Sequence, residues 1–134
     1  MDFEFINDTN RLKIKAFGKN ITELFFNAAL GMMTFMYPED IASRDYETKE
    51  KIRIRAGDQK SLLVDWLTEL LYFSNTKKVC YNNFYFETLA ENQLSITAYG
   101  RRAGLKESIK LVALKDLQIN QTKNGLEALI EFDI

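Results

Sequence analysis

The residues of this sequence that could carry out chemistry are its carboxylates, because the usual nucleophiles and metal ligands are almost absent. The 134 residues include no histidine and one cysteine, Cys80. Without histidine, neither a serine–histidine–aspartate triad nor a cysteine–histidine pair can form, and one thiolate cannot close a zinc shell. Any metal would be bound by oxygen atoms, which Ca²⁺ and Mg²⁺ prefer. Hydrolysis by carboxylates and metal ions is therefore the one catalytic alternative left open.

The charged residues that could form such a site lie on two predicted strands near opposite ends of the sequence, Arg11–Gly18 and Leu126–Ile134. Alternation with period two gives each strand one charged side, formed by Arg11, Lys13, Lys15, Glu127, Glu131 and Asp133. Opposite charges at facing positions stabilise strand pairing by roughly 0.2–1 kcal/mol each. The pattern fits two solvated, complementary sheet faces, and it also fits a site built between them.

Two helices are expected to support these strands. Apolar residues at helical spacing predict one helix over Ile21–Tyr37, capped by Asn20 or Thr22, and a second over Lys60–Asn75, capped by Asp58. The first helix is apolar over most of its circumference, so we expect it to be packed on two sides.

The rest of the chain alternates with period two and predicts further strands. They are Phe3–Ile6, Arg11–Gly18, Lys51–Ala56, Tyr81–Leu89, Leu94–Gly100, Ser108–Leu114, Leu117–Asn120 and Leu126–Ile134. A hairpin turn at Lys123-Asn124-Gly125 precedes the last strand. The aromatic residues Tyr81, Phe84, Tyr85 and Phe86 are typical of core packing rather than of a base-stacking platform. The prediction is one α+β domain over residues 1–134, with two helices and mostly antiparallel sheets.

The bulk composition restricts location and partners. A net charge of −1 and a pI near 5.6 give no general attraction to nucleic acid, so only a local basic patch could bind it. The acidic, strand-like start of the sequence is not a signal peptide, and no apolar run is long enough to span a bilayer. A lone cysteine fits a reducing compartment, and we expect a cytoplasmic protein with no membrane partner.

The chain resembles the archease family over essentially its whole length. The resemblance rests on the segments Lys13–Lys19, Leu24–Leu30, Leu62–Tyr72, Thr97–Gly100 and Phe132–Ile134, of which Leu62–Tyr72 is the most specific. Archeases are small cytosolic proteins that promote turnover of RtcB-type RNA ligases, which join RNA halves during tRNA splicing. The family was also regarded as chaperone-like, or as a modulator of RNA-modifying enzymes.

The resemblance further implies a metal site, and this sequence departs from the family there. In archeases the aspartate of a His-Thr-Ala-Asp motif helps to bind a metal, together with the last aspartate and the chain-end carboxylate. The motif aligns with Asp8-Thr9-Asn10-Arg11, so Asp8 replaces the histidine and Arg11 replaces the ligand aspartate. Asp133 and Ile134 match the family pattern at the chain end.

Two lysines complete the implied site. Lys110 matches a basic family position, and Lys115 replaces a second family histidine. We expect Arg11 to pair with Asp133 and to take over the electrostatic role of the cation, which predicts weak or absent binding of calcium or magnesium. The competing hypothesis retains a divalent cation bound by Asp8, Asp133 and the carboxylate of Ile134.

The function that the resemblance implies is that of a non-catalytic accessory protein of an RtcB-type RNA ligase, with at most indirect contact to RNA. Three alternatives stay open beside the carboxylate hydrolase. They are a chaperone-like binding protein, a modulator of RNA-modifying enzymes, and a divergent paralogue that has lost the ligase role.

Overall fold

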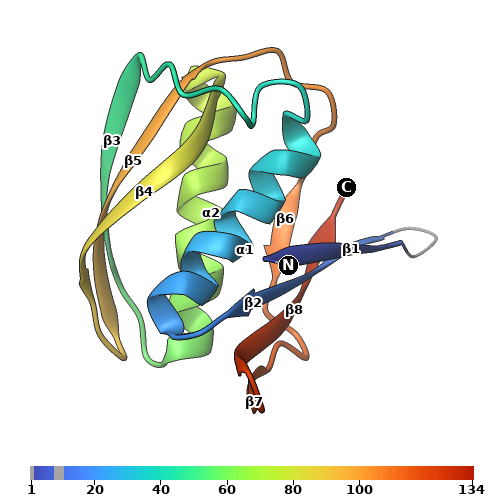
Figure 1. The fold of residues 1–134 in the computed structure, drawn as a ribbon, viewed down its shortest axis with the longest axis vertical. Helices are drawn as coiled ribbons and strands as arrows, with labels where there is room; N and C mark the ends of the chain where they lie inside the picture. The colour runs from blue at the N-terminus through green and yellow to red at the C-terminus, as the bar shows by residue number, and fades with distance from the viewer. Residues whose placement is uncertain (1, 8–10) are drawn as a thin grey trace.

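Two antiparallel sheets enclose a layer of two helices in the computed structural model, which describes residues 2–7 and 11–134 (Figure 1). The elements are β1 (Phe3–Asn7), β2 (Arg11–Gly18), α1 (Ile21–Met36), β3 (Thr48–Arg55), α2 (Gln59–Lys77), β4 (Val79–Leu89), β5 (Gln93–Arg102), β6 (Leu111–Ala113), β7 (Ile119–Thr122) and β8 (Gly125–Asp133). None of the helices in the described ranges combines the length and the apolar character that crossing a bilayer requires.

The two sheets differ in the number and order of their strands. The larger sheet has the order β1-β2-β8-β6, with β7 also paired to β8, while the smaller sheet has the order β3-β5-β4. All of these pairings are antiparallel. Strand β8 is thus the hub of the larger sheet, since it pairs with β2, β6 and β7. The fold confirms the predicted α+β domain.

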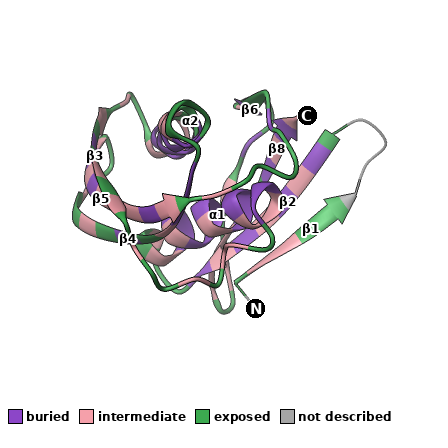
Figure 2. Cartoon of the chain, turned by 90° about the horizontal axis from the view of Figure 1, so that it is seen from above, coloured by how far each residue is buried: buried purple, intermediate pink, exposed green. Residues whose placement is uncertain are grey.

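Helix α1 occupies the centre of the molecule, between the inner faces of the two sheets (Figure 2). It begins after Asn20, whose side chain accepts a hydrogen bond of 2.9 Å from the backbone N–H of Glu23, and it ends at Met36, shortly before Pro38. Its buried residues, which surround the helix axis, are Leu24, Phe25, Asn27, Ala28, Ala29, Gly31, Met32, Met33 and Met36. The predicted packing on two sides is confirmed.

Helix α2 lies beside α1 and is attached to it by a buried polar contact. Its N-cap is Asp58, as predicted, and the Asp58 side chain accepts a hydrogen bond of 2.8 Å from the N–H of Ser61. Trp66 is fully buried, and its Nε1 donates to the carbonyl of Phe25 in α1 at 3.1 Å. The Trp66 ring also packs edge-to-face against Phe84 of the smaller sheet. One side chain therefore joins both helices and a sheet.

Most predicted strands are confirmed, but the predicted strand Ser108–Leu114 is shorter than expected. Only Leu111–Ala113 pairs with β8. The chain before it crosses the end of α1, where the N–H of Lys106 donates to the carbonyl of Met36 at 3.0 Å. Leu111 pairs with Asp133, which is the last residue of β8, so the residues before Leu111 have no strand beside them and β6 begins later than the side-chain alternation predicts.

The β7–β8 hairpin has the predicted turn, and it packs closely against β2. Thr122 pairs with Gly125, which leaves Lys123 and Asn124 as a two-residue loop. Gly125 has a φ of 139°, and a Cβ there would lie 2.3 Å from the carbonyl oxygen of Gly18. Only glycine tolerates both conditions.

The aromatic residues of β4 divide between the two faces of the smaller sheet. Tyr81 and Phe84 are buried as predicted, but Tyr85 is 63% exposed, so the prediction that it belongs to the core is wrong. The reason is the strand alternation, since Phe84 and Phe86 point inward and the residue between them must point outward. Cys80 is fully buried, and burial raises the pKa of its thiol to about 12, which confirms it as a small apolar core residue.

The buried contact between Trp66 and α1 predicts a clear loss of stability. Trp66→Phe removes the donor to the carbonyl of Phe25 and leaves unfilled volume, so we expect the free energy of unfolding to fall by about 2–4 kcal/mol. Tyr72→Phe, on the exposed side of the same helix, is the matched control and should change it by less than about 0.5 kcal/mol. Urea denaturation followed by circular dichroism measures both values. Equal effects of the two variants would contradict this role of Trp66.

The cap of α2 predicts a pH dependence of stability. Hydrogen bonds from Ser61, the backbone N–H first, lower the pKa of Asp58 below its ordinary value of 3.8. The native state thus favours the carboxylate, so this stabilisation is complete above the ordinary pKa and is lost as the pH falls through the folded-state pKa. Asp58→Asn keeps a capping acceptor but does not titrate. We expect the Tm difference between wild type and Asp58→Asn to shrink from pH 6 to pH 3 in thermal melts, and a constant difference would contradict the assignment.

Candidate functional site

Strand register brings the candidate site residues together at one corner of the larger sheet. Arg11 of β2 lies directly opposite Asp133 of β8. On the other side of β8, Leu111 of β6 pairs with Asp133, and the N–H of Lys110 donates to the carbonyl oxygen of Asp133 at 2.7 Å. The segment ending in Asp133 is therefore fixed on both sides by backbone contacts.

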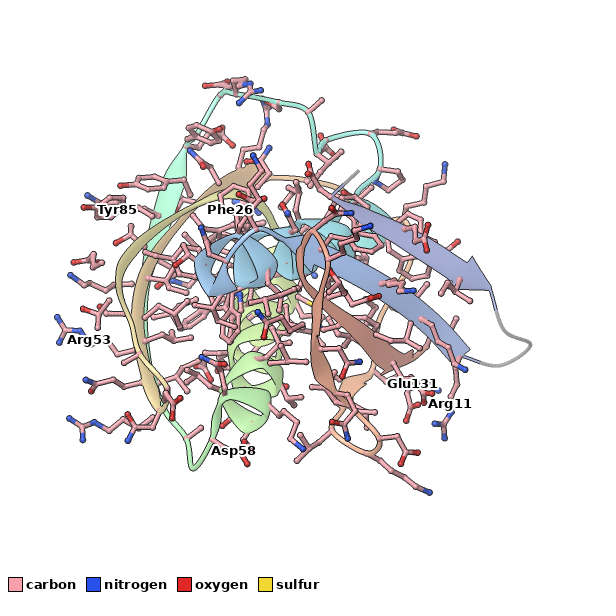
Figure 3. All side chains as sticks on the ribbon, turned by 60° about the horizontal axis from the view of Figure 1, so that its bottom comes forward. Arg11, Phe26, Arg53, Asp58, Tyr85 and Glu131 are labelled. Carbon is pink, nitrogen blue, oxygen red and sulfur yellow. The ribbon has the colours of Figure 1, made fainter. Side chains whose placement is uncertain are left out.

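The Arg11 guanidinium contacts two carboxylates on the outer face of this sheet (Figure 3). Its Nη1 lies 2.9 Å from Oε2 of Glu131, and its Nε lies 3.7 Å from Oδ1 of Asp133. Arg11 thus faces Asp133, but the closer and hydrogen-bonded contact is to Glu131. The guanidinium therefore contacts both acids and does not pair with Asp133 alone.

Further ion pairs extend this charged face along the two strands. Nζ of Lys13 lies 3.6 Å from Oε1 of Glu131, and Nζ of Lys15 lies 3.1 Å from Oε2 of Glu127. Each such exposed pair contributes up to about 1 kcal/mol. The face has the complementary charges that the sequence predicts, and they reinforce the register between β2 and β8.

The described residues fit a divalent cation poorly. Glu131 and Asp133 supply the oxygen ligands that Ca²⁺ prefers, but a guanidinium already lies against both. Across residues 2–7 and 11–134, no group of three or more Asp, Glu, Cys or His side chains is arranged to hold a metal. Asp8 lies outside the described residues, so its predicted role as a ligand stays a prediction, as does weak or absent cation binding.

The other predicted site residues that the structure describes are Ile134, Lys110 and Lys115, and the first two lie next to Asp133. Ile134 directly follows β8, and its side chain is 45% exposed. Lys110 adjoins Asp133 through its backbone, as described above. Lys115 lies in the turn after β6, where the N–H of Leu117 donates to the carbonyl of Leu114. Because β6 runs away from Asp133 before this turn, Lys115 lies beyond the far end of β6 and not beside Asp133.

Two features of this corner were not predicted. Glu131, expected only as part of the charged face, accepts a closer contact from Arg11 than Asp133 does, and its position two residues before Asp133 on the same side of the strand was the signal for it. Exposed leucines accompany the charges, since Leu111 is 47% exposed and Leu129 is 40% exposed. Leu111 must point outward because Val112 next to it is buried. The corner therefore combines carboxylates, cations and accessible apolar side chains.

The arrangement of two antiparallel sheets around two central helices is shared with solved structures. The solution structure of Methanobacterium thermoautotrophicum protein 1598 matches this fold with a TM-score of 0.77 and 26% identity, and the match covers 98% of each chain. The crystal structure of an archease from Thermotoga maritima, described as a possible chaperone, matches with a TM-score of 0.62 at 14% identity, again over 98% of each chain. The second likeness concerns the fold alone.

Sequence comparison places the chain more specifically. The Archease protein family (MTH1598/TM1083) matches residues 3–134. Among curated relatives, protein archease of Methanosarcina barkeri is 34% identical over 98% of this chain and 95% of its own length, and protein archease of Methanosarcina mazei is 31% identical over the same shares. This chain belongs to the archease family.

The contacts of Arg11 predict how the corner responds to divalent cations. For the wild type we expect a Tm that changes by less than about 1 °C between excess EDTA and 5 mM CaCl₂, because binding adds stability only where a ligand site exists. Arg11→Asp removes the cation and adds a carboxylate beside Glu131 and Asp133. This variant should gain a calcium-dependent rise in Tm.

Arg11→Ala is the matched control, since it removes the guanidinium without adding a ligand. It should show a smaller response than Arg11→Asp. A strong calcium response of the wild type would show that a divalent cation binds despite Arg11, in line with the hypothesis that includes Asp8.

Proposed function

We propose that this protein is a non-catalytic accessory factor that binds an RtcB-type RNA ligase and increases its turnover in tRNA splicing. Membership of the archease family supports the proposal, and the corner around Asp133 is the single observation that carries it. There, the acidic and basic side chains of β2 and β8 lie beside exposed leucines on a rigid sheet. Protein interfaces commonly combine apolar anchors with a charged rim in this way.

The charges at the corner support a role in binding rather than in catalysis. Glu131 contacts Arg11 and Lys13, and Asp133 contacts Arg11, so both carboxylates have cationic neighbours at the surface. Active sites commonly close around their reacting groups and expel water. The side chains of Glu131 and Asp133 are instead 25% and 39% exposed and lie against cations, an arrangement that suits electrostatic steering and orientation of a partner protein.

The proposed mechanism is selective binding to one state of the ligase. A binding protein shifts an equilibrium only through unequal affinity for the states involved. The corner would bind the ligase more tightly in the state from which its active form is restored, and the protein would dissociate once that form is reached. The proposal places the protein in the cytoplasm, where Cys80 stays reduced.

A general chaperone is the alternative that the description of the Thermotoga maritima relative raises. Chaperones bind unfolded clients through broad apolar surfaces. The exposed leucines at this corner alternate with charged positions on the strands, which fits a specific partner better. Protection of an unrelated unfolding enzyme from aggregation by equimolar protein would favour the alternative.

A multiple-turnover ligation assay tests the proposed function. With the RtcB-type ligase of the same organism and excess RNA halves, we expect the wild type to raise the number of turnovers per ligase. Asp133→Ala should reduce this stimulation, and Leu111→Ala combined with Leu129→Ala should weaken binding to the ligase about tenfold or more. Leu105→Ala is the matched control, because Leu105 is 48% exposed in the loop after β5.

The same assay can contradict the proposal. If the wild type leaves turnover unchanged under conditions in which another archease stimulates its ligase, the ligase role has been lost in this chain. If the leucine variants and the Leu105→Ala control behave alike, the corner is not the docking surface.

A further inference from the structure

The outer face of the smaller sheet, on the opposite side of the helix layer from Arg11, has a regular pattern of side chains. Strand β3 contributes a row of four cations, which are Lys49, Lys51, Arg53 and Arg55. The register pairs these residues with Tyr99, Thr97, Ser95 and Gln93 of β5. The next positions on β4 are Asn83, Tyr85 and Thr88. The face thus has a basic edge, a polar middle and an aromatic residue near its far edge.

The basic row differs from the charges of the larger sheet because, among the described residues, most of it forms no ion pair. Lys51 contacts Glu87 at 2.9 Å, and Glu87 also accepts a hydrogen bond from Thr97. Lys49, Arg53 and Arg55 have no acidic group within 4.0 Å among the residues that the structure describes. By strand parity, Glu87 is the one acid that β3, β4 and β5 present on this face, and all three strands are fully described.

The spacing of the cations suits a linear polyanion. Residues two apart on a strand are separated by about 6.6–6.8 Å, so the four side chains extend over about 20 Å along β3. Figure 3 shows Arg53 and Tyr85 projecting from this sheet, away from the helices. A chain of phosphates that followed β3 would meet a cation at each step.

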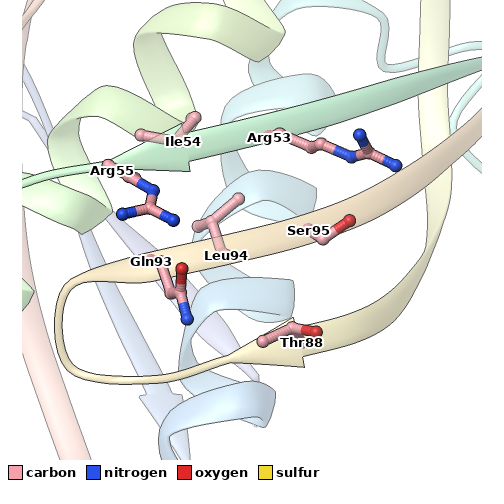
Figure 4. A pocket seen from close by; sticks show the side chains of 7 residues that line it. All are labelled: Arg53, Ile54, Arg55, Thr88, Gln93, Leu94 and Ser95. Carbon is pink, nitrogen blue, oxygen red and sulfur yellow. The ribbon is translucent and has the colours of Figure 1, made fainter.

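The rest of the face suits bases and sugars. Tyr85 is 63% exposed and lies across β5 from the basic row, where a base could stack on its ring. Hydroxyl and amide groups lie between the two edges. Near the end of β3, Arg53, Arg55, Thr88, Gln93 and Ser95, together with Ile54 and Leu94, line an open hollow of about 400 Å³ (Figure 4). Its polar groups can bind a ribose 2′-hydroxyl or the edge of a base.

We propose that this face binds single-stranded RNA, with the phosphates along β3 and the bases directed across β5 toward Tyr85. The length of the basic row corresponds to about four nucleotides. An acidic protein is the competing occupant, and competition by polyglutamate distinguishes it from RNA. The inference goes beyond assistance to a ligase, since it concerns RNA contact by this chain alone.

Fluorescence anisotropy with a labelled 12-nucleotide oligouridylate and no ligase present tests the charges. Arg53→Gln combined with Arg55→Gln should reduce the slope of log K against log[salt] by about 1.4, since each phosphate contact on a single strand contributes about 0.7. If the two proteins bind equally at 1 M salt, this slope change corresponds to binding about 25-fold weaker at 0.1 M. Lys19→Gln combined with Lys123→Gln removes the same charge at exposed positions near the larger sheet and should leave the slope unchanged.

Variants at Tyr85 test stacking separately from charge. Tyr85→Ala should weaken binding at least about fivefold, while Tyr85→Phe keeps the ring and should stay within about twofold of the wild type. Circular dichroism checks that these surface variants remain folded.

Three results would overturn the proposal. The first is the same slope change in both double variants. The second is binding of a DNA oligonucleotide of the same length as tightly as the RNA. The third is competition by a polyglutamate of the same charge as effective as competition by the RNA. The last result would identify an acidic protein as the partner. Ligase stimulation without RNA binding would contradict this inference and leave the proposed function intact.

Discussion

The structure depends on the burial of α1, a helix that is apolar around most of its circumference. Leu24, Met32 and Met33 are all fully buried, although they point in different directions from the helix axis. Apolar surface on every side can be removed from water only by covering every side, so two sheets are required where an amphipathic helix would need one. Helix α2 completes this cover, and the hydrogen bond from Trp66 to Phe25 fixes the relative position of the two helices.

This central helix also keeps the two exposed sheet faces apart. On the larger sheet, cations of β2 lie opposite carboxylates of β8 and contact them, as Lys13 contacts Glu131. On the smaller sheet, Arg53 and Arg55 lie beside neutral polar residues. The net charge of −1 is therefore distributed unevenly over the two faces. On the larger sheet the charges largely neutralise one another, while the outer face of the smaller sheet is basic. Because the two faces lie on opposite sides of the helix layer, a partner on one face does not obstruct a partner on the other.

Much of the fold could be predicted from local patterns. The caps at Asn20 and Asp58 mark both helix starts, and alternation shows which side of β8 is charged, because these signals act over a few residues. The shortened β6 could not be predicted, since its start depends on where the partner strand β8 ends, at Asp133 opposite Leu111. The preference of Arg11 for Glu131 over Asp133 could not be predicted either, because it depends on how a long side chain lies across two strands. The sequence pattern thus predicts on which face of a strand a side chain lies, while the tertiary structure determines which neighbouring group it contacts.

The pairing of β2 with β8 joins residues 120 positions apart, as the contact between Arg11 and Glu131 shows. Until β8 is in place, the β1–β2 hairpin has no partner strand and one side of α1 stays open to water. Long-range pairing of this kind makes folding slow relative to proteins with local contacts. On a ribosome, the larger sheet cannot be completed until β8 has been synthesised, 120 residues after Arg11 in the case of Glu131. The half-covered α1 is the segment that a chaperone or protease would meet in the meantime.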